Sequence, residues 1–452
     1  MRDLILAAFL FGSVPFILWR PAIGVFLWVW ISVMSPHRLT FGFAYDYSFA
    51  QLIAIATLVG MLFSKEPKRL PVTPVTVVLF VLILWMNVTT FFSLDVAVAL
   101  PMWERVMKIQ LMIFVSLYVL YSKQHVQVLM WIMAGSVAFY GAKGGLFTLR
   151  EGGEFRVFGP PGSFIEENNA LALATIMTLP LLYYLFLRST KRLLRWGLLA
   201  TMVLCSFSAL GSYSRGGFLA FGAAIVFFWW KGRRKLVSGL ALAMLVPVAI
   251  GYMPEKWMAR MSSIQQYDQD ASSLGRINAW TMAVNLANDR PLVGGGFEAF
   301  TERAFGKYAP DPSDVHAAHS IYFQILGDHG YAGLALFLLL WILVWRDASW
   351  IIRHSRSQGE LKWAFDLARM TQVSLVGYFV GGAFLSLAYY DVPYNLVVAL
   401  ILTRVLVERE VRSLQQQEDV PVRPQVDAGE GGEPSASAGT GFDTQMNPDR
   451  RG

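Results

Sequence analysis

The chain has 452 residues, of which 55% are hydrophobic, 14% aromatic and only 15% charged, with a net charge of +7. So few ionisable side chains cannot cover an ordinary soluble surface, and the mean hydropathy of +0.46 indicates an integral membrane protein. Nucleic-acid binding is not indicated, because the Lys and Arg residues fall mostly in short loops between apolar segments. The single cysteine, Cys205, excludes an intrachain disulfide and a Cys-based zinc site.

Apolar segments recur from the N-terminus to about residue 408, and a transmembrane helix needs about 20 mostly apolar residues. The sequence therefore predicts an all-α polytopic membrane protein with about twelve transmembrane helices. The expected segments are 4–19, 22–34, 47–63, 75–92, 107–121, 126–142, 171–187, 196–212, 218–230, 236–252, 321–345, 371–387 and 394–407. The first two meet at Arg20-Pro21, where we expect a re-entrant segment or a broken helix; the alternative is an N-terminus on the outer face.

Four short loops are rich in Lys and Arg and are therefore expected to stay in the cytoplasm: 65–69, 191–195, 231–235 and 346–362. The segments that alternate with them should share the opposite, outer face: 94–106, 143–170, 213–217 and 253–320.

The chain then divides into four parts. We expect N-terminal transmembrane helices over 1–252 with the outer loop 143–170, an outer loop module over 253–320, C-terminal transmembrane helices over 321–414, and a cytoplasmic tail over 415–452. The tail is rich in Gly, Pro, Glu, Gln and Ser and should be disordered, because it cannot bury enough apolar surface to offset chain entropy.

Three outer segments carry chemically useful side chains, and the first contains Ser214 and Arg215. The guanidinium stands at the junction of two apolar segments, beside Gly216 and Gly217, which permit close approach of a ligand to the backbone. The alternative is an interfacial Arg that reaches toward lipid head groups.

The second segment contains Arg276 and Trp280. Together with Ala283 they have the spacing i, i+4, i+7, which predicts a helix, and the triple glycine 294–296 should end it in a flexible turn. A plain amphipathic helix without a binding role is the alternative.

The third segment contains His316 and His319. No His-Glu-x-x-His or Asp-rich motif accompanies them, so a metal site is not indicated. An imidazole at the membrane rim suits general-base catalysis near neutral pH, because its ordinary pKa lies close to that pH. A capping or hydrogen-bonding histidine remains the alternative for each.

Arginine offers planar, permanently charged donors that match phosphate oxygens, so Arg215 and Arg276 are suited to bind a pyrophosphate without metal. With an imidazole base on the same face, this set indicates transfer of a sugar from a lipid pyrophosphate to a hydroxyl.

The order Ser214-Arg215-Gly216, Arg276-x-x-x-Trp280, Gly294 to Gly296, and His319-Ser320 leading into residues 326–330 resembles the bacterial O-antigen ligase and polymerase superfamily. The resemblance covers about residues 158–333 and implies a glycosyltransferase C-like fold in the inner membrane, with the outer face periplasmic. It implies metal-independent, inverting glycosyl transfer without a cofactor.

By this resemblance His319 is the base, and Arg215 and Arg276 bind the donor pyrophosphate. His316, Trp280 and Ser214 are possible supporting residues. Asn168 and Asn169, with the segment 159–164, resemble family positions near the lipid entrance.

The implied partners are membrane lipids, an undecaprenyl-pyrophosphate-linked glycan as donor and a lipid A-core sugar as acceptor. An O-antigen polymerase and a protein O-oligosaccharyltransferase that use the same donor remain open. A lipid-linked oligosaccharide flippase is the alternative from another class, although the cationic residues cluster at one end rather than along a cavity.

Overall fold

The computed structural model describes residues 1–232, 235–266 and 271–418, and every regular element within these ranges is helical. The α-helices are α1 (Arg2–Trp19), α2 (Pro21–Met34), α3 (Phe49–Phe63), α4 (Pro74–Phe91), α5 (Val96–Val119), α6 (Lys123–Arg150), α7 (Asn168–Arg188), α8 (Arg192–Gly211), α9 (Arg215–Lys231), α10 (Lys235–Gly251), α11 (Glu255–Ser262), α12 (Ala271–Asp289), α13 (Glu302–Tyr308), α14 (Ile321–Ser355), α15 (Lys362–Gly382) and α16 (Asp391–Glu418). Two 3₁₀ helices are η1 (Pro36–Leu39) and η2 (Ser263–Gln266). The all-α prediction is confirmed; of the expected tail, residues 419–452 lie outside the described part.

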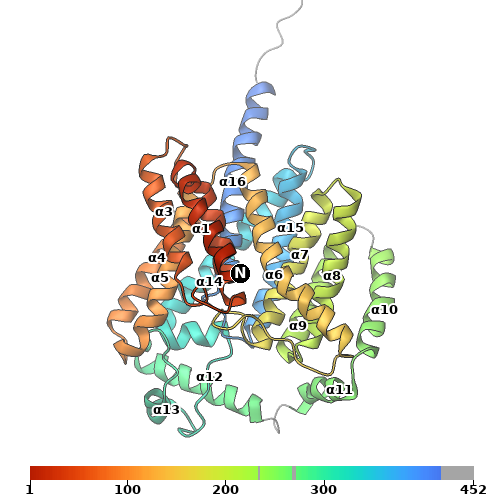
Figure 1. The fold of residues 1–452 in the computed structure, drawn as a ribbon. Coiled ribbons are helices and arrows are strands. Elements are labelled where there is room, and N and C mark those ends of the chain that lie inside the picture. Colours follow the sequence, from red (N-terminus) through yellow and green to blue (C-terminus); the bar gives the residue numbers. More distant parts are fainter. Residues whose placement is uncertain (233–234, 267–270, 419–452) are drawn as a thin grey trace, which may run out of the picture. The chain divides into compact units, whose positions relative to one another are not determined.

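Residues 1–411 form one compact unit, and residues 412–452 form a second. Within the first unit, α7 packs against α6, α8, α9 and α15, while α14 packs against α4, α12 and α15 (Figure 1). Helix α7 is the most enclosed of the candidate membrane spans, with 78% of its most apolar stretch buried against 22% for α1. The short helices α11 and α13 lie with α12 at one end of this bundle (Figure 1).

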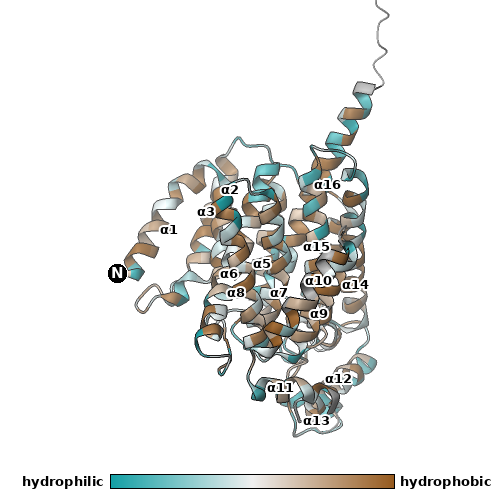
Figure 2. Ribbon diagram, turned by 90° about the vertical axis from the view of Figure 1, so that its right-hand side faces the viewer, coloured by the Kyte–Doolittle hydropathy of each residue, from teal (hydrophilic) through white to brown (hydrophobic). Residues whose placement is uncertain are grey.

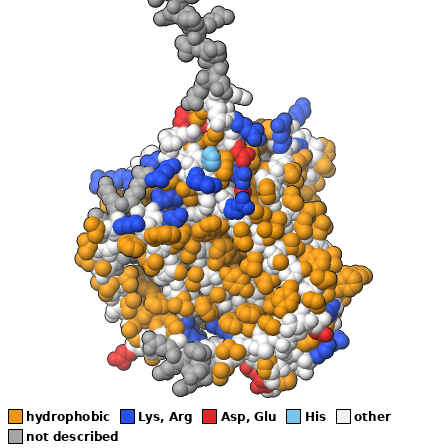
Figure 3. Space-filling view, turned by 180° about the vertical axis from the view of Figure 1, so that it is seen from behind, with side chains coloured by type: hydrophobic (Ala, Val, Ile, Leu, Met, Phe, Trp, Pro, Cys, Tyr) orange, Lys and Arg blue, Asp and Glu red, His pale blue; other side chains and the backbone are white. Residues whose placement is uncertain are grey.

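All thirteen apolar segments of the sequence fall on helices. Within the described ranges, six helices are long and apolar enough to cross a membrane: α1, α4, α6, α7, α8 and α14. Helices α2 and α3 are apolar but shorter. Hydrophobic residues run along the bundle helices (Figure 2), and a continuous hydrophobic belt covers the face in Figure 3, with Lys and Arg gathered at one edge. The protein is therefore a multi-pass membrane protein, and about twelve crossings stays a prediction.

The structure gives the boundaries of two expected interruptions between helices. Arg20 has an extended backbone, with φ −130° and ψ 95°, so α1 and α2 are separate helices at the expected Arg20-Pro21 junction. The outer loop expected over 143–170 is shorter, because α6 continues to Arg150 and α7 begins at Asn168.

Helix α14 is broken at Gly330, which has φ 67° and ψ −171°. The triple glycine packs directly on this break: Gly295 N donates to Gly327 O, and Gly296 N to Asp328 O, both at 2.8 Å. A Cβ at Gly294 would lie 2.6 Å from Gly327 O, so only glycine permits this approach. The triple glycine is thus a docking site that fixes the outer module on α14, rather than a simple flexible turn.

Candidate active site

A cavity of about 310 Å³ lies between the outer module and the bundle, and His319 lines it. Its wall combines one guanidinium, several carboxylates, an amide and two aromatic rings. The polar and aromatic residues of the wall that bear on the chemistry are Arg105, Phe164, Glu166, Glu167, Glu298, His319, Gln324 and Asp328. The residues come from α5, the loop before α7, the turn after the triple glycine, and the start of α14.

His319 occupies the last loop position but one before α14, with a positive φ of 43°. Helix α12 holds this loop: Trp280 Nε1 donates to Ala318 O at 2.7 Å, and the Trp280 ring stacks on Phe323 with centroids 4.8 Å apart. Two residues earlier, Asn278 Nδ2 donates to the carbonyl oxygen of Asp314 at 3.0 Å. The expected helix over Arg276 and Trp280 is therefore a platform that positions His319.

Arg276 lies close enough to His319 to affect its charge state. Burial lowers the pKa of His319 to about 4, and the positive charge of Arg276, with a contribution from His316, lowers it in the same direction. The expectation that this imidazole keeps its ordinary pKa is therefore wrong. His319 is neutral across the physiological range and available to accept a proton.

His316 has a different setting from His319. Its Nε2 lies 2.7 Å from Asp314 Oδ1, and its ring lies against Gly275, where an added Cβ would stand 2.5 Å from Cδ2. The ring is exposed and does not line the cavity. Within the described ranges, no group of three His, Cys, Asp or Glu side chains is arranged to hold a metal ion.

Arg215 is the buried first residue of α9 and does not line the cavity. Ser214 caps this helix by accepting from Gly217 N at 3.0 Å. The Arg215 guanidinium donates to Ser263 Oγ, at 3.1 Å, on η2 of the outer module. Arg276 and His319 are thus brought together, whereas Arg215 is not part of the cavity wall.

Asn168 connects the Arg215 turn to the cavity wall. It is the first residue of α7, and its Nδ2 donates to Ser212 O at 2.7 Å. The neighbouring residues Glu167 and Ala170 line the cavity, while Asn169 is half-buried and does not. The loop before α7 therefore lies at the cavity, and Asn168 ties it to the turn that precedes Arg215.

The cavity residues Arg105, Glu298 and Asp328 are among those that were not predicted from the sequence. The Arg105 guanidinium lies 3.7 Å from the centroid of the Phe164 ring. Burial raises the pKa of Glu298, although the charge of Arg105 opposes the shift. The sequence offered one clue to this site, namely Arg105, because a charged residue beside an apolar segment indicates a functional site.

Asp328 is buried at the break in α14 and is held by several polar contacts. Tyr389 Oη donates to Asp328 Oδ2 at 2.6 Å, and Ala299 N donates to Oδ1 at 3.2 Å. The same hydroxyl lies 2.9 Å from His329 Nε2. This network fixes the cavity floor to the turn that follows the triple glycine.

The charges around His319 differ on its two sides. Arg276 provides a cation on the side of α12, whereas the cavity contains Glu166, Glu167 and Glu298 with only Arg105 as a cation. A polyanion is favoured on the first side and a neutral, hydroxyl-rich group on the second.

The site thus joins an imidazole, His319, to a nearby guanidinium and a cavity with several carboxylates, in a polytopic α-helical membrane protein. Residues 200–338, which include Arg215, Arg276 and His319, match the family model for O-antigen ligase. This match confirms, over that part of the chain, the predicted resemblance to the O-antigen ligase and polymerase superfamily. Residues 1–190 match a family of unknown function, and no curated protein matches the chain.

Proposed function

We propose that the protein is an O-antigen ligase that transfers a glycan from undecaprenyl pyrophosphate to a lipid A-core sugar hydroxyl at the periplasmic face of the inner membrane. The observation that carries this proposal is the pairing of a neutral His319 with Arg276 at the edge of an acidic cavity. The family match supports the general class of lipid-linked glycan chemistry.

His319 removes the proton from the acceptor hydroxyl, and the resulting oxygen attacks the anomeric carbon of the donor sugar. The bond between that carbon and the pyrophosphate oxygen breaks as the new glycosidic bond forms. The electron pair leaves with undecaprenyl pyrophosphate, and the proton stays on His319 until it passes to solvent. Attack opposite the leaving group inverts the anomeric configuration.

Arg276 binds the donor pyrophosphate and stabilises the negative charge that grows on it. Arg215 contributes by supporting the outer module through its hydrogen bond to Ser263. A bound pyrophosphate also offsets the charge of Arg276, so the pKa of His319 rises and the imidazole becomes a stronger base once the donor is present.

The acidic cavity receives the acceptor sugar. Carboxylates such as Glu298 accept hydrogen bonds from sugar hydroxyls, and the Phe164 ring offers an apolar surface for the sugar face. These carboxylates repel the donor pyrophosphate, so the two substrates are kept on opposite sides of His319.

The test is reconstitution of the full chain in liposomes with an undecaprenyl-pyrophosphate glycan and separate acceptors, followed by product mass. A lipid A-core product that His319→Ala no longer forms, at unchanged protein level, supports the proposal. A longer lipid-linked glycan as the sole product identifies a polymerase instead, and a glycosylated protein identifies a protein O-oligosaccharyltransferase. Donor movement across the bilayer without transfer refutes the enzyme assignment.

A further inference from the structure

A second cavity, of about 490 Å³, is lined by residues of α4, α9, α14, α15 and α16, and we call it the basic cavity. Its wall holds four cations and one carboxylate. The charged residues are Lys231, Arg346, Asp347, Arg353 and Arg404. The remaining wall is mixed, with Leu343 and Ile352 as apolar residues and Trp350 as an aromatic one.

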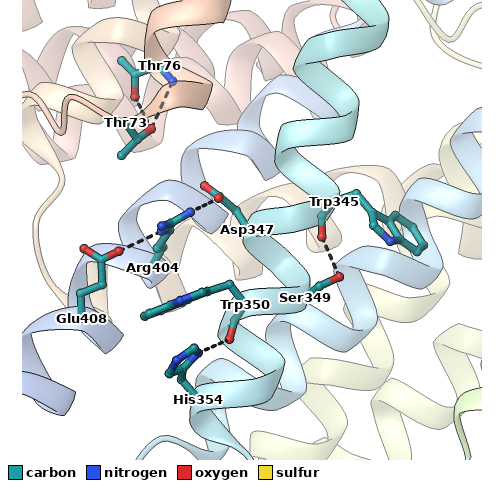
Figure 4. A network of polar contacts seen from close by, with 9 residues as sticks. All are labelled: Thr73, Thr76, Trp345, Asp347, Ser349, Trp350, His354, Arg404 and Glu408. Atoms are coloured by element: carbon teal, nitrogen blue, oxygen red, sulfur yellow. Dashed lines mark hydrogen bonds and ion pairs between the residues drawn. The ribbon is translucent and has the colours of Figure 1, made fainter.

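Only one of the four cations is neutralised by neighbouring carboxylates. Arg404 forms ion pairs with Asp347 and with Glu408, the second at 2.9 Å, and its guanidinium lies 5.1 Å from the Trp350 ring centroid (Figure 4). Lys231, Arg346 and Arg353 make no ion pair with any described residue. Like charges that line one cavity repel each other, so an anion bound in the basic cavity lowers the electrostatic energy of these cations.

The helix geometry directs these cations toward the same space. Arg346 and Arg353 are seven residues apart on α14, which places them on one face, and Trp350 lies between them on that face. Lys231 ends α9, and its ammonium lies 5.4 Å from the Phe227 ring centroid. The lining residues thus form a cationic recess rather than a scatter of surface charges.

The basic cavity is remote from His319 along the chain and in space. The part of α14 after its break at Gly330 runs for 15 residues from Tyr331 to Arg346, about 22 Å at about 1.5 Å per residue. This length is most of a bilayer core of about 30 Å, so Arg346 lies toward the opposite end of α14 from the break. Figure 3 shows Lys and Arg side chains gathered at the edge of the hydrophobic belt, where lipid phosphates lie.

We propose that the basic cavity binds the head group of an anionic phospholipid, with its phosphodiester among Lys231, Arg346 and Arg353. Basic recesses between transmembrane helices are suited to such head groups, and guanidinium groups bind phosphate oxygens in pairs. Leu343 and Ile352 contact the first carbons of the acyl chains, and Trp350 lies at the interface. This inference does not depend on the proposed glycan transfer.

The experiment measures lipid binding to the purified full chain in a neutral detergent by native mass spectrometry. Phosphatidylglycerol and phosphatidylcholine with the same acyl chains are added separately, and inorganic phosphate is added in excess in a third arm. We expect phosphatidylglycerol to stay bound, phosphatidylcholine to be lost, and phosphate not to displace the phosphatidylglycerol.

The test variant is the double substitution Arg346→Gln with Arg353→Gln, and the matched control is Arg356→Gln with Lys362→Gln. The control removes the same charge from exposed residues outside the cavity. We expect about a thirtyfold weaker affinity for phosphatidylglycerol in the test variant, the factor that two basic residues contribute at an anionic lipid surface. The control should bind as the wild type does.

Equal weakening in the two double variants would show a diffuse surface-charge effect and overturn the proposal. Equal retention of the two lipids would also overturn it, and displacement by phosphate would show a phosphate site instead of a lipid site. If the double variant is not monodisperse, Lys231→Gln replaces it, and a loss of about fivefold is expected for that single cation.

Discussion

Glycan transfer should persist to about pH 5, because burial, Arg276 and His316 lower the pKa of His319 to about 4. A base with that pKa is about 90% neutral at about pH 5, whereas a histidine at its ordinary value is only about 3% neutral there. The direction of this pH dependence follows from the mechanism. Protonation of His319 occupies the lone pair that takes the proton from the acceptor hydroxyl. Activity is therefore present above the lowered pKa and lost as the pH falls through it.

The assay is kcat/KM for the donor in liposomes from about pH 4 to about pH 8, because this ratio reports ionisations of the free enzyme. Arg276→Gln should move the midpoint upward, since the cation that opposes protonation of His319 is gone. The control is Arg303→Gln, an exposed cation on α13 with no part in the shift. A wild-type midpoint between about pH 6 and about pH 7, or the same midpoint in Arg276→Gln, would refute this reasoning.

The pH dependence of kcat should show a second effect of the charge on Arg276. It reports the complex with donor, in which the pyrophosphate offsets the positive charge of Arg276. The kcat midpoint should therefore lie above the kcat/KM midpoint. Coincident midpoints would show that the donor anion does not reach the neighbourhood of His319.

Arg276→Lys should lose most activity, because an ammonium keeps the charge but lacks the bidentate fork; full kcat/KM would contradict the pyrophosphate contact. Chelation with EDTA should leave transfer by the purified protein unchanged, and activity that returns only with added divalent cation would contradict a metal-independent mechanism. Gly294→Ala should cost about 1–3 kcal/mol, because the residue has φ 60° and contacts Gly327 O. The thermal midpoint should fall in this variant and not in Gly306→Ala, whose added methyl meets open space.

The helices were predictable because their signal is local. Apolar length and the placement of basic loops located all thirteen segments, down to the interruption at Arg20-Pro21. The i, i+4 spacing of Arg276 and Trp280 likewise gave the correct element, α12. What these patterns specify is which residues share a helix, and nothing in them requires the helix to contact a distant loop.

The tertiary features of the site could not be predicted in this way. Arg105 enters the cavity because α5 begins at Val96, earlier than its apolar segment indicates. The lowered pKa of His319 arises from burial and from residues on another element. The role of Gly294 depends on a backbone contact with residues more than thirty positions later. Each of these depends on which elements pack together.

The break in α14 explains how a membrane protein keeps such a site rigid. Irregular backbone near a membrane is stable only where its polar groups are satisfied within the protein. The freed carbonyls of Gly327 and Asp328 accept from the triple glycine, and Tyr331 N donates to Pro291 O at 2.8 Å. The loop that supplies these hydrogen bonds also contains Glu298, a cavity residue. The short first part of α14 begins two residues after His319. The same contacts that stabilise the broken helix therefore fix the position of His319 relative to Glu298 in the cavity wall.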